Sequence, residues 1–192
     1  MRIKQAIQQS IEVKEKILQD ETFLRKIEEV AGKCIAALKN GNQLLFCGNG
    51  GSAADAQHLA AEFSGRFYFD REPLNAEALH VNTSYLTAVA NDYSYDEVYA
   101  RLVKAKGKKG DVLVALTTSG NSENVIKAME TARSLGIINV AFTGDGGGKA
   151  RTLADYLFNV PSNDTPRIQE SHILIGHIIC ELVESKLFSK KQ

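Results

Sequence analysis

Residues 43–62 decide the fold of this chain, and they read Gln43-Leu-Leu-Phe-Cys-Gly-Asn-Gly-Gly-Ser-Ala-Ala-Asp-Ala-Gln-His-Leu-Ala-Ala-Glu62. The apolar start predicts a buried strand, the glycines predict a turn, and the alanine-rich remainder predicts a helix. Backbone N–H groups at the start of such a helix favour a bound anion. His58 and Glu62 are four residues apart, which puts both on one face of the helix. The segment therefore predicts a polar ligand site at a strand end, beside a metal-binding or acid–base pair.

The alternation of strand and helix patterns continues through the rest of the chain. It predicts a mostly parallel, doubly wound sheet in a three-layer αβα sandwich, the flavodoxin-like type of α/β fold. Ligands of such sheets gather beyond the carboxyl ends of the strands, where the glycine turn lies. The five expected strands cover residues 43–47, 77–81, 111–116, 139–143 and 155–160.

Two amphipathic helices are expected before the sheet, over residues 2–19 and 22–39, and one long helix after it, over 166–187. The length of the chain fits a single domain, residues 1–192. Within it, residues 1–40 would serve in packing or oligomerisation, and residues 41–192 would form the αβα core and the C-terminal helix. The first two helices carry more apolar surface than one sheet face needs, and closed symmetric assemblies usually cover such surfaces.

Composition excludes several classes of function. Lys+Arg and Asp+Glu both number 23, so the formal net charge is zero and nucleic-acid binding has little electrostatic support. The N-terminus opens a helix rather than a signal peptide, and no apolar run is long enough to span a bilayer. Cys34, Cys47 and Cys180 are scattered, which is typical of buried thiols in a reducing cytoplasm. We therefore expect a cytoplasmic protein that binds neither nucleic acid nor membrane.

The glycine turn has two competing interpretations. Gly48-x-Gly50-x-x-Ala53 formally fits the dinucleotide fingerprint, but that fingerprint also needs an acidic residue at the end of the next strand. Asp70 has about the right offset, yet it lies outside any apolar run. The turn could also be a plain strand-to-helix connection, which would explain one or two glycines better than three.

A second polar loop, Thr117-Thr-Ser-Gly-Asn-Ser122, also lies between a predicted strand and a predicted helix. A helix N-cap needs only one such residue, whereas this loop has five hydroxyl or amide side chains in six positions. A phosphate-binding loop is therefore the better interpretation. The loop contains no Lys or Arg, so hydroxyls and backbone dipoles would hold the anion.

The long last helix carries a few polar residues among isoleucines and leucines. Gln169 and His177 are two turns apart and roughly on one side, whereas His172 is expected to be a satisfied core residue. His80 is expected to be structural, inside its strand. Asn91-Asp92 falls between two predicted helices, either as a plain turn or as a polar element near the glycine loop.

Taken together, these residues resemble the sugar-isomerase (SIS) domain family, and within it the members that act on phosphorylated heptoses. The resemblance covers nearly the whole chain, and the joint occurrence of its motifs makes it specific. The matching elements are Cys-Gly-Asn-Gly-Gly-Ser at 47–52, Gln-His-x3-Glu at 57–62, Asn-Asp at 91–92, Thr-Ser-Gly-Asn-Ser at 118–122, and Arg-Ile-Gln-Glu-x-His at 167–172 followed by His177.

The resemblance implies an aldose–ketose isomerase that converts D-sedoheptulose 7-phosphate to D-glycero-D-manno-heptose 7-phosphate, for bacterial nucleotide-activated heptose synthesis. Carried over residue by residue, Glu62 is the base that moves a proton between C1 and C2, and His177 is its acid/base partner. The implied zinc ligands are His58, Glu62, Gln169 and His177. The implied substrate contacts are Asn49, Gly50, Gly51, Glu62, Asn91, Asp92, Thr117, Thr118, Ser119, Ser122 and Gln169.

The resemblance also implies a homotetramer with sites shared between subunits. Isomerising a hydroxy-ketone needs a base and charge stabilisation, and a divalent ion can polarise the substrate oxygens. Gln is an unusual zinc ligand, and Glu62 cannot be a free base while tightly ligated. One departure is Pro166, where some family members carry an acidic residue; the function of that acid is therefore not expected here.

Two alternatives remain open. One is a non-catalytic SIS-domain protein that binds the bacterial replication initiator. It resembles the pattern poorly at Glu62, Ser119 and His177, and this chain has all three. The other is a phosphosugar-binding regulatory domain, for which a DNA-binding module would be expected and is not seen. The sequence favours the enzyme.

Overall fold

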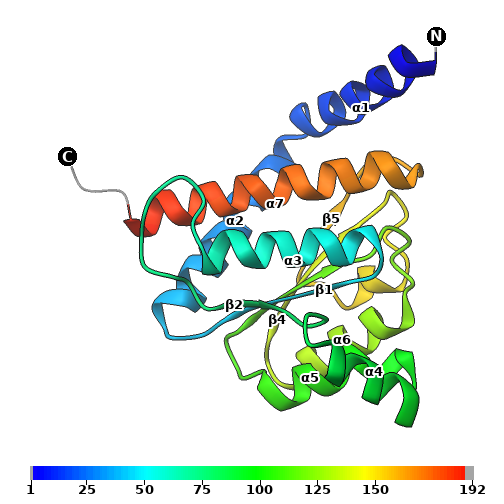
Figure 1. Ribbon diagram of the computed structural model, residues 1–192. Helices are drawn as coiled ribbons and strands as arrows, with labels where there is room; N and C mark the ends of the chain where they lie inside the picture. Colours follow the sequence, from blue (N-terminus) through cyan, green and yellow to red (C-terminus); the bar gives the residue numbers. More distant parts are fainter. Residues whose placement is uncertain (1, 189–192) are drawn as a thin grey trace.

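In the computed structural model, which describes residues 2–188, a five-stranded sheet lies between two layers of helices (Figure 1). The chain alternates between strands and helices once the first two helices have passed. In chain order the elements are α1 (Arg2–Leu18), α2 (Glu21–Lys39), β1 (Leu44–Gly48), α3 (Gly51–Ser64), β2 (Ala76–Ala78), α4 (Thr83–Asp92), the 3₁₀ turn η1 (Tyr95–Glu97), α5 (Val98–Lys106), β3 (Val112–Leu116), α6 (Glu123–Ser134), β4 (Ile138–Thr143), η2 (Lys149–Thr152), β5 (Tyr156–Asn159) and α7 (Thr165–Phe188).

All five strands are parallel, in the order β2-β1-β3-β4-β5. This confirms the predicted α/β sandwich with a flavodoxin-like strand order, in which every described pairing is parallel. The order reverses direction between β1 and β3, whose residues pair from Leu44 with Val112 to Gly48 with Leu116. In open α/β sheets the ligand crevice lies at such a switch point, beyond the carboxyl ends of the strands.

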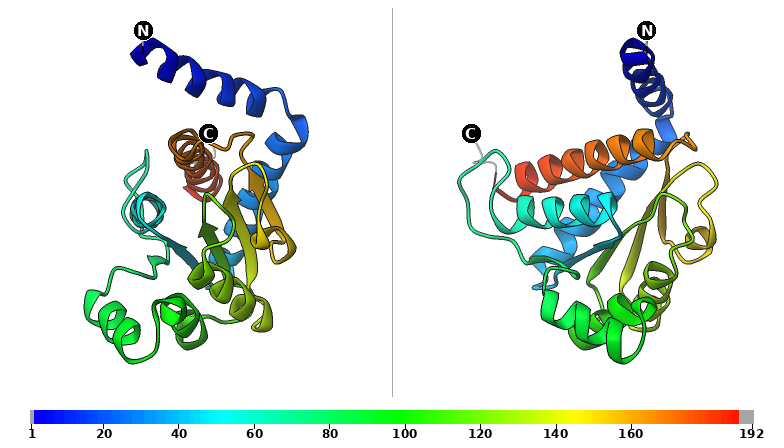
Figure 2. Two further views of the ribbon diagram at one scale, coloured as in Figure 1. Left: turned by 90° about the vertical axis from the view of Figure 1, so that its right-hand side faces the viewer. Right: turned by 45° about the vertical axis from the view of Figure 1, so that its right-hand side comes forward.

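Each face of the sheet has its own layer of helices and its own core. Helices α2, α3 and α7 pack on the face to which Leu44 and Phe46 point, and α4, α5 and α6 pack on the face of Leu45 and Cys47. Figure 2 shows these two layers from the side. Successive side chains of a strand point to opposite faces, so a strand covered on both faces is apolar throughout. That is why β1 and β3 are continuous apolar runs that are buried along their length.

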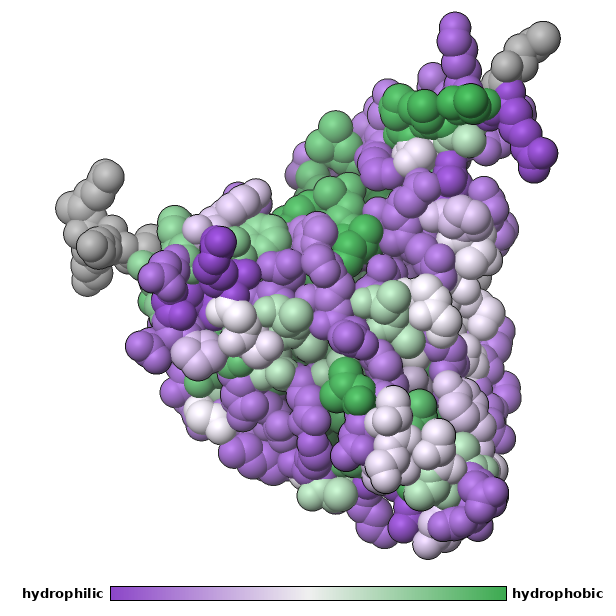
Figure 3. Space-filling view, viewed as in Figure 1, coloured by the Kyte–Doolittle hydropathy of each residue, from purple (hydrophilic) through white to green (hydrophobic). Residues whose placement is uncertain are grey.

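Helix α1 projects away from the body (Figure 1), and apolar side chains on it are exposed (Figure 3). Ile3, Ile7 and Ile11 are 78%, 57% and 43% exposed. Polar contacts hold the helix to α7, since Ser10 donates to Glu170 at 2.7 Å. The proposed use of residues 1–40 in oligomerisation stays a prediction.

Two sequence predictions are corrected in the segment between β2 and α5. The strand expected over residues 77–81 covers only Ala76–Ala78, so His80 lies in a turn rather than a strand. It stops early because β2 is an edge strand that pairs with β1 over three residues, after which Asn82 caps α4. Helix α4 then continues through Asn91 and Asp92, which form its last turn instead of a loop between helices.

Cys34, Cys47 and Cys180 are buried and free of disulfides, in agreement with the expected buried thiols. Burial raises the pKa of Cys47, at the glycine turn, to about 12, so its thiol is not a nucleophile near neutral pH. Between residues 2 and 188 the protein has no helix with the length and apolar character that crossing a membrane requires.

Helices α3 and α7 approach each other so closely that α7 needs a glycine at the contact. A Cβ on Gly176 would lie 2.5–2.6 Å from both methyl carbons of Leu59, which is itself buried. Gly176→Ala should therefore lower the free energy of unfolding by about 1–3 kcal/mol through overpacking. Denaturant unfolding measures this.

Gly32→Ala on α2 is the matched control. Nothing lies within 4 Å of its added Cβ, and alanine stabilises a helix interior by about 0.5–1 kcal/mol relative to glycine. If both variants were equally stable, the α3–α7 contact would not be as tight as described.

Candidate functional site

The glycine turn after β1 is built for close backbone packing. A Cβ on Gly48 would lie 2.7 Å from the carbonyl oxygen of Ser52 and 2.9 Å from that of Leu116 on β3. Gly50 has φ +55°, a conformation that side chains disfavour. The N–H groups of Ser52 and Ala53 already bond to carbonyls within the turn, so fewer backbone N–H groups are free to bind an anion than the sequence suggests.

Asn49 joins the glycine turn to the start of α6. Its amide exchanges two hydrogen bonds with the amide of Asn124, at 2.8 and 2.9 Å, and its Oδ1 also accepts from Tyr95 at 3.2 Å. Sequence reasoning missed Asn124. The sequence offered no signal for it, because the burial that makes this amide need a partner is visible only in the structure.

The loop from Thr117 to Ser122 lies beside the glycine turn, at the carboxyl end of β3. Ser122 occupies the N-cap position of α6, yet its side chain makes no capping bond and instead lies 3.1 Å from the hydroxyl of Thr117. Asn121 donates to the carbonyl oxygen of Ser119 at 2.9 Å, and Ser119 itself is exposed. The hydroxyls of the loop are only partly free, because Thr117 is buried and pairs with Ser122, and the Oγ of the exposed Ser119 accepts from the N–H of Asn121 at 3.1 Å.

A third loop, Gly144–Gly148, supports this hydroxyl-rich loop, and sequence reasoning did not identify it. A Cβ on Gly148 would lie 2.6 Å from the backbone of Gly120, and the N–H of Lys149 donates to Asn121 at 3.0 Å. Between the two loops lies a cavity of about 260 Å³, lined by Thr118, Ser119, residues 144–147, Asn163, Thr165 and Ile168.

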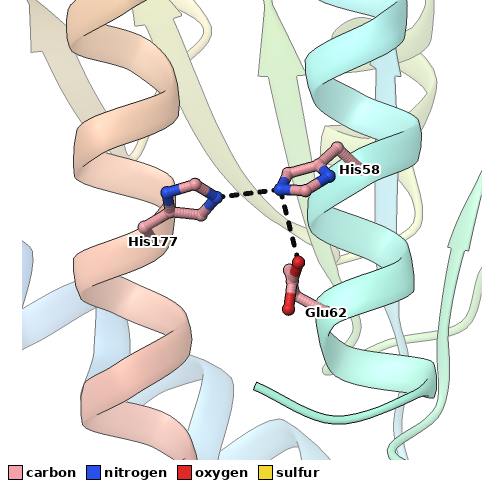
Figure 4. A group of neighbouring side chains, drawn as sticks. All are labelled: His58, Glu62 and His177. Atoms are coloured by element: carbon pink, nitrogen blue, oxygen red, sulfur yellow. Dashed lines mark hydrogen bonds and ion pairs between the residues drawn. The ribbon is translucent and has the colours of Figure 1, made fainter. Parts of the chain in front are cut away.

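His58, Glu62 and His177 form a compact cluster between α3 and α7 (Figure 4). The Nε2 atom of His58 lies 2.9 Å from Nε2 of His177 and 3.3 Å from a carboxylate oxygen of Glu62. His58 and Glu62 come from α3, four residues apart, and His177 faces them from α7. His58 thus contacts both other side chains, and the predicted helix-face pair forms, with His177, a group that could hold a metal ion.

Burial and charge favour the neutral form of His177. Its pKa is lowered first by burial and next by the neighbouring His58 ring, whereas the Glu62 carboxylate acts in the opposite direction. The ring centroid of Phe67 lies 5.7 Å from that of His177. A neutral imidazole can accept a proton or bind a metal ion.

The geometry of the cluster fits a divalent transition metal. Tetrahedral zinc with Zn–N bonds of about 2.0–2.1 Å would hold two ring nitrogens about 3.4 Å apart, close to the separations found here. Two imidazoles and a carboxylate are also a common donor set for zinc with an open position for substrate.

Gln169, the fourth predicted ligand, does not join this cluster within one chain. Its amide lies against the glycine turn, where a Cβ on Gly51 would be 2.7 Å from Nε2 of Gln169. Eight residues of α7 separate it from His177, about 12 Å along the helix axis. The structure thus places Gln169 with the predicted substrate loops and His177 with the predicted base.

The remaining polar residues are distributed as follows. Asn91 and Asp92 lie on α4, where Asn91 donates to Asp92 at 2.9 Å; among the described hydrogen bonds, none joins them to the glycine turn. His172 is fully buried with Nε2 3.1 Å from the carbonyl oxygen of Thr143, and burial lowers its pKa to about 4; the predicted core position is confirmed, but its Nδ1 has no hydrogen-bond partner among the described residues, so the ring is not fully satisfied.

The SIS domain family matches residues 7–144 of this chain. The phosphoheptose isomerase of Aneurinibacillus thermoaerophilus is 57% identical over 189 residues, which cover 98% of this chain and 96% of that protein. The solved phosphoheptose isomerase of Neisseria gonorrhoeae is 42% identical with a TM-score of 0.90, and that of Francisella tularensis is 34% identical with a TM-score of 0.91. Each comparison covers 96% of this chain and 97% of the solved one. The chain belongs to the SIS domain family and, within it, to the phosphoheptose isomerases.

We predict that the cluster binds zinc, used here as the probe metal. His58→Ala and His177→Ala should each weaken binding by more than the roughly 10–100-fold that loss of an outer-shell partner costs. Occupancy should fall as the pH drops through the imidazole range, because metal ligands must be deprotonated. Competition with a chromophoric chelator measures the affinity.

His80→Ala is the control, because this histidine lies outside the cluster. Undiminished zinc binding in the double variant His58→Ala/His177→Ala would place the metal elsewhere.

Proposed function

We propose that this protein is an aldose–ketose isomerase that interconverts D-sedoheptulose 7-phosphate and D-glycero-D-manno-heptose 7-phosphate. The strongest support for this proposal is the His58–Glu62–His177 cluster, because it occurs in a chain that is 57% identical to a phosphoheptose isomerase. A carboxylate beside a neutral imidazole is what proton transfer at adjacent carbon and oxygen atoms requires.

Glu62 is the proposed base. It removes a proton from C1 of the ketose, a C1–C2 double bond forms, and His177 gives a proton to the carbonyl oxygen on C2. Glu62 then returns the proton to C2, while His177 takes the hydroxyl proton from the oxygen on C1, where the aldehyde forms. The lowered pKa of His177 is compatible with this role, because a protonated ring there gives up its proton more readily than an ordinary histidine, and the neutral ring that remains can take a proton back.

Zinc is the proposed metal, held by His58, Glu62 and His177, and when bound it would polarise the substrate oxygens. Because a tightly ligated carboxylate is not a free base, the proton transfer proposed for Glu62 requires its carboxylate to be free of the metal. His58 would keep its position throughout, because its ring contacts both Glu62 and His177.

The phosphate is proposed to bind at the Thr117–Ser122 loop, beside the glycine turn. The exposed Ser119 and the uncapped start of α6 support this. A seven-carbon sugar phosphate is roughly 10 Å long when extended at ordinary bond lengths, so the phosphate-binding loop and the acid–base cluster can lie well apart. Asn49, Gly50, Gly51 and Gln169 would contact the sugar between them.

The names of the relatives support an enzyme over the two alternatives, a non-catalytic protein that binds the replication initiator and a phosphosugar-binding regulatory domain. The reported curated relative and both solved relatives are called phosphoheptose isomerases. The three residues expected to differ in the non-catalytic protein, Glu62, Ser119 and His177, are all present.

The reaction itself is the first test. NMR of the purified protein with sedoheptulose 7-phosphate should show the aldose signals appear. Glu62→Gln and His177→Ala should each slow turnover by about 10²–10⁴-fold, the usual contribution of a general acid or base. Glu181→Gln, an exposed carboxylate on α7, is the matched control and should keep full activity. Normal turnover in folded Glu62→Gln would remove the proposed base.

A homotetramer with shared sites is proposed as the working unit. The exposed stripe of Ile3, Ile7 and Ile11 on α1 supports an assembly, because a second copy would remove it from water. The separation of Gln169 from the cluster supports shared sites, because a neighbouring chain could supply the fourth ligand. Such a neighbour would bring its glycine turn as well, since Gln169 lies against Gly51.

Mixed oligomers test this arrangement. Subunits carrying Glu62→Gln and subunits carrying Gln169→Ala, each inactive alone, should regain activity when mixed, because some sites then combine an intact Glu62 with the partner's Gln169. Mixing Glu62→Gln with His177→Ala should restore nothing, because those residues meet within one chain. Recovery only in the second mixture, or a monomer in light scattering, would contradict the proposal.

A further inference from the structure

A buried ion pair joins the loop after α3 to α7, close to the proposed catalytic cluster and not part of it. Arg71 Nε lies 2.8 Å from Glu184 Oε1, and each side chain is only 2% exposed. Charges buried this deeply are unfavourable unless they are paired and fully hydrogen-bonded. The contacts of each partner therefore indicate what the pair holds in place.

Arg71 binds the end of α3. Its Nη2 donates to the carbonyl oxygen of Glu62 at 2.8 Å, and its Nη1 donates to those of Phe63 at 2.8 Å and Gly65 at 3.1 Å. The last carbonyls of a helix have no partner within the helix, and a cation there interacts favourably with the helix dipole. One of the three residues held in this way is the proposed base itself.

Glu184 binds the chain that follows α3. Its carboxylate accepts the N–H groups of Phe67, Tyr68 and Phe69 at 2.9, 2.6 and 3.0 Å. These bonds, with the bond from Arg71, outweigh the effect of burial and lower the pKa of the carboxyl. Glu184 is seven residues after His177, about two turns further along α7 on the same side.

The ion pair is thus one of the connections between the two helices that carry the cluster, and it reaches Glu62 through the backbone carbonyl of that residue. We propose that Arg71 and Glu184 are positioning residues, which set the distance and angle between Glu62 on α3 and His177 on α7. Of the expected effects, only the change in kcat rests on the proposed function. A shift of about 1 Å in a catalytic group can cost a factor near 100 in rate, so the pair can affect the rate of the reaction without touching the substrate.

Charge-conserving variants test the proposal, because they avoid leaving an unpaired buried charge. Glu184→Asp shortens the carboxylate arm by one methylene, and Arg71→Lys removes the planar fork that reaches several carbonyls at once. For each variant we expect kcat to fall at least about tenfold with a smaller change in KM, and zinc affinity of the metal-free protein to fall at least about tenfold.

Val103→Ala is the control for plain destabilisation. Val103 is fully buried in α5 on the opposite face of the sheet, in the other core. It should lower the melting temperature as much as the ion-pair variants or more, while leaving kcat and zinc affinity unchanged. If the ion-pair variants behave like Val103→Ala, with a lower melting temperature and normal kcat and zinc affinity, the pair only stabilises the fold and the proposal is wrong.

A crystal structure of Glu184→Asp gives a readout that depends on neither activity nor metal. We expect the Glu62 carboxylate and the His177 ring to lie further apart than in the wild type, and an unchanged separation would overturn the proposal. Absence of turnover in the wild-type protein would refute the proposed function, while the zinc affinity and the crystal structure would still decide on the ion pair.

Discussion

The close packing of α3 against α7 is the contact on which the candidate site depends. Gly176 allows it, because any side chain there would overlap the methyl groups of Leu59. At this spacing the next residue along α7, His177, reaches His58 on α3. Since the interior of a protein is packed to crystal-like density, a small change in this contact would be transmitted to the cluster rather than absorbed.

The contact is supported at both ends. Near the start of the two helices, Gln169 lies against Gly51, and near their other end Arg71 and Glu184 join the last carbonyls of α3 to α7. The cluster of His58, Glu62 and His177 lies between these supports. Polar groups are thus held by a rigid frame that is built from apolar packing in the middle and from satisfied hydrogen bonds at the edges.

The second half of the site uses backbone rather than side-chain charge. The loops after β1, β3 and β4 meet where the strand order reverses, and glycines allow their main chains to approach closely at Gly48, Gly120 and Gly148. The Asn49–Asn124 amide pair then joins the first loop to the start of α6, the helix that follows the second loop. Parallel strands bring all their carboxyl ends to one edge of the sheet, which is why loops distant in sequence form one surface.

Sequence by itself determined the elements, the fold class and most of the polar residues, because these follow from local periodicity, turn chemistry and spacing. The pair His58 and Glu62 was visible as two residues one helical turn apart, and the loop of residues 117–122 as more polar than a cap requires. The early end of β2 was not visible, since it depends on pairing at a sheet edge. The family resemblance had already grouped both His177 and Gln169 with His58 and Glu62, and only the tertiary structure decided that His177 reaches the cluster within one chain while Gln169 does not. It also decided that Asn124, residues 144–148 and the Arg71–Glu184 pair support the site. Those outcomes depend on the distance between helices and between loops, which no local pattern in the chain encodes.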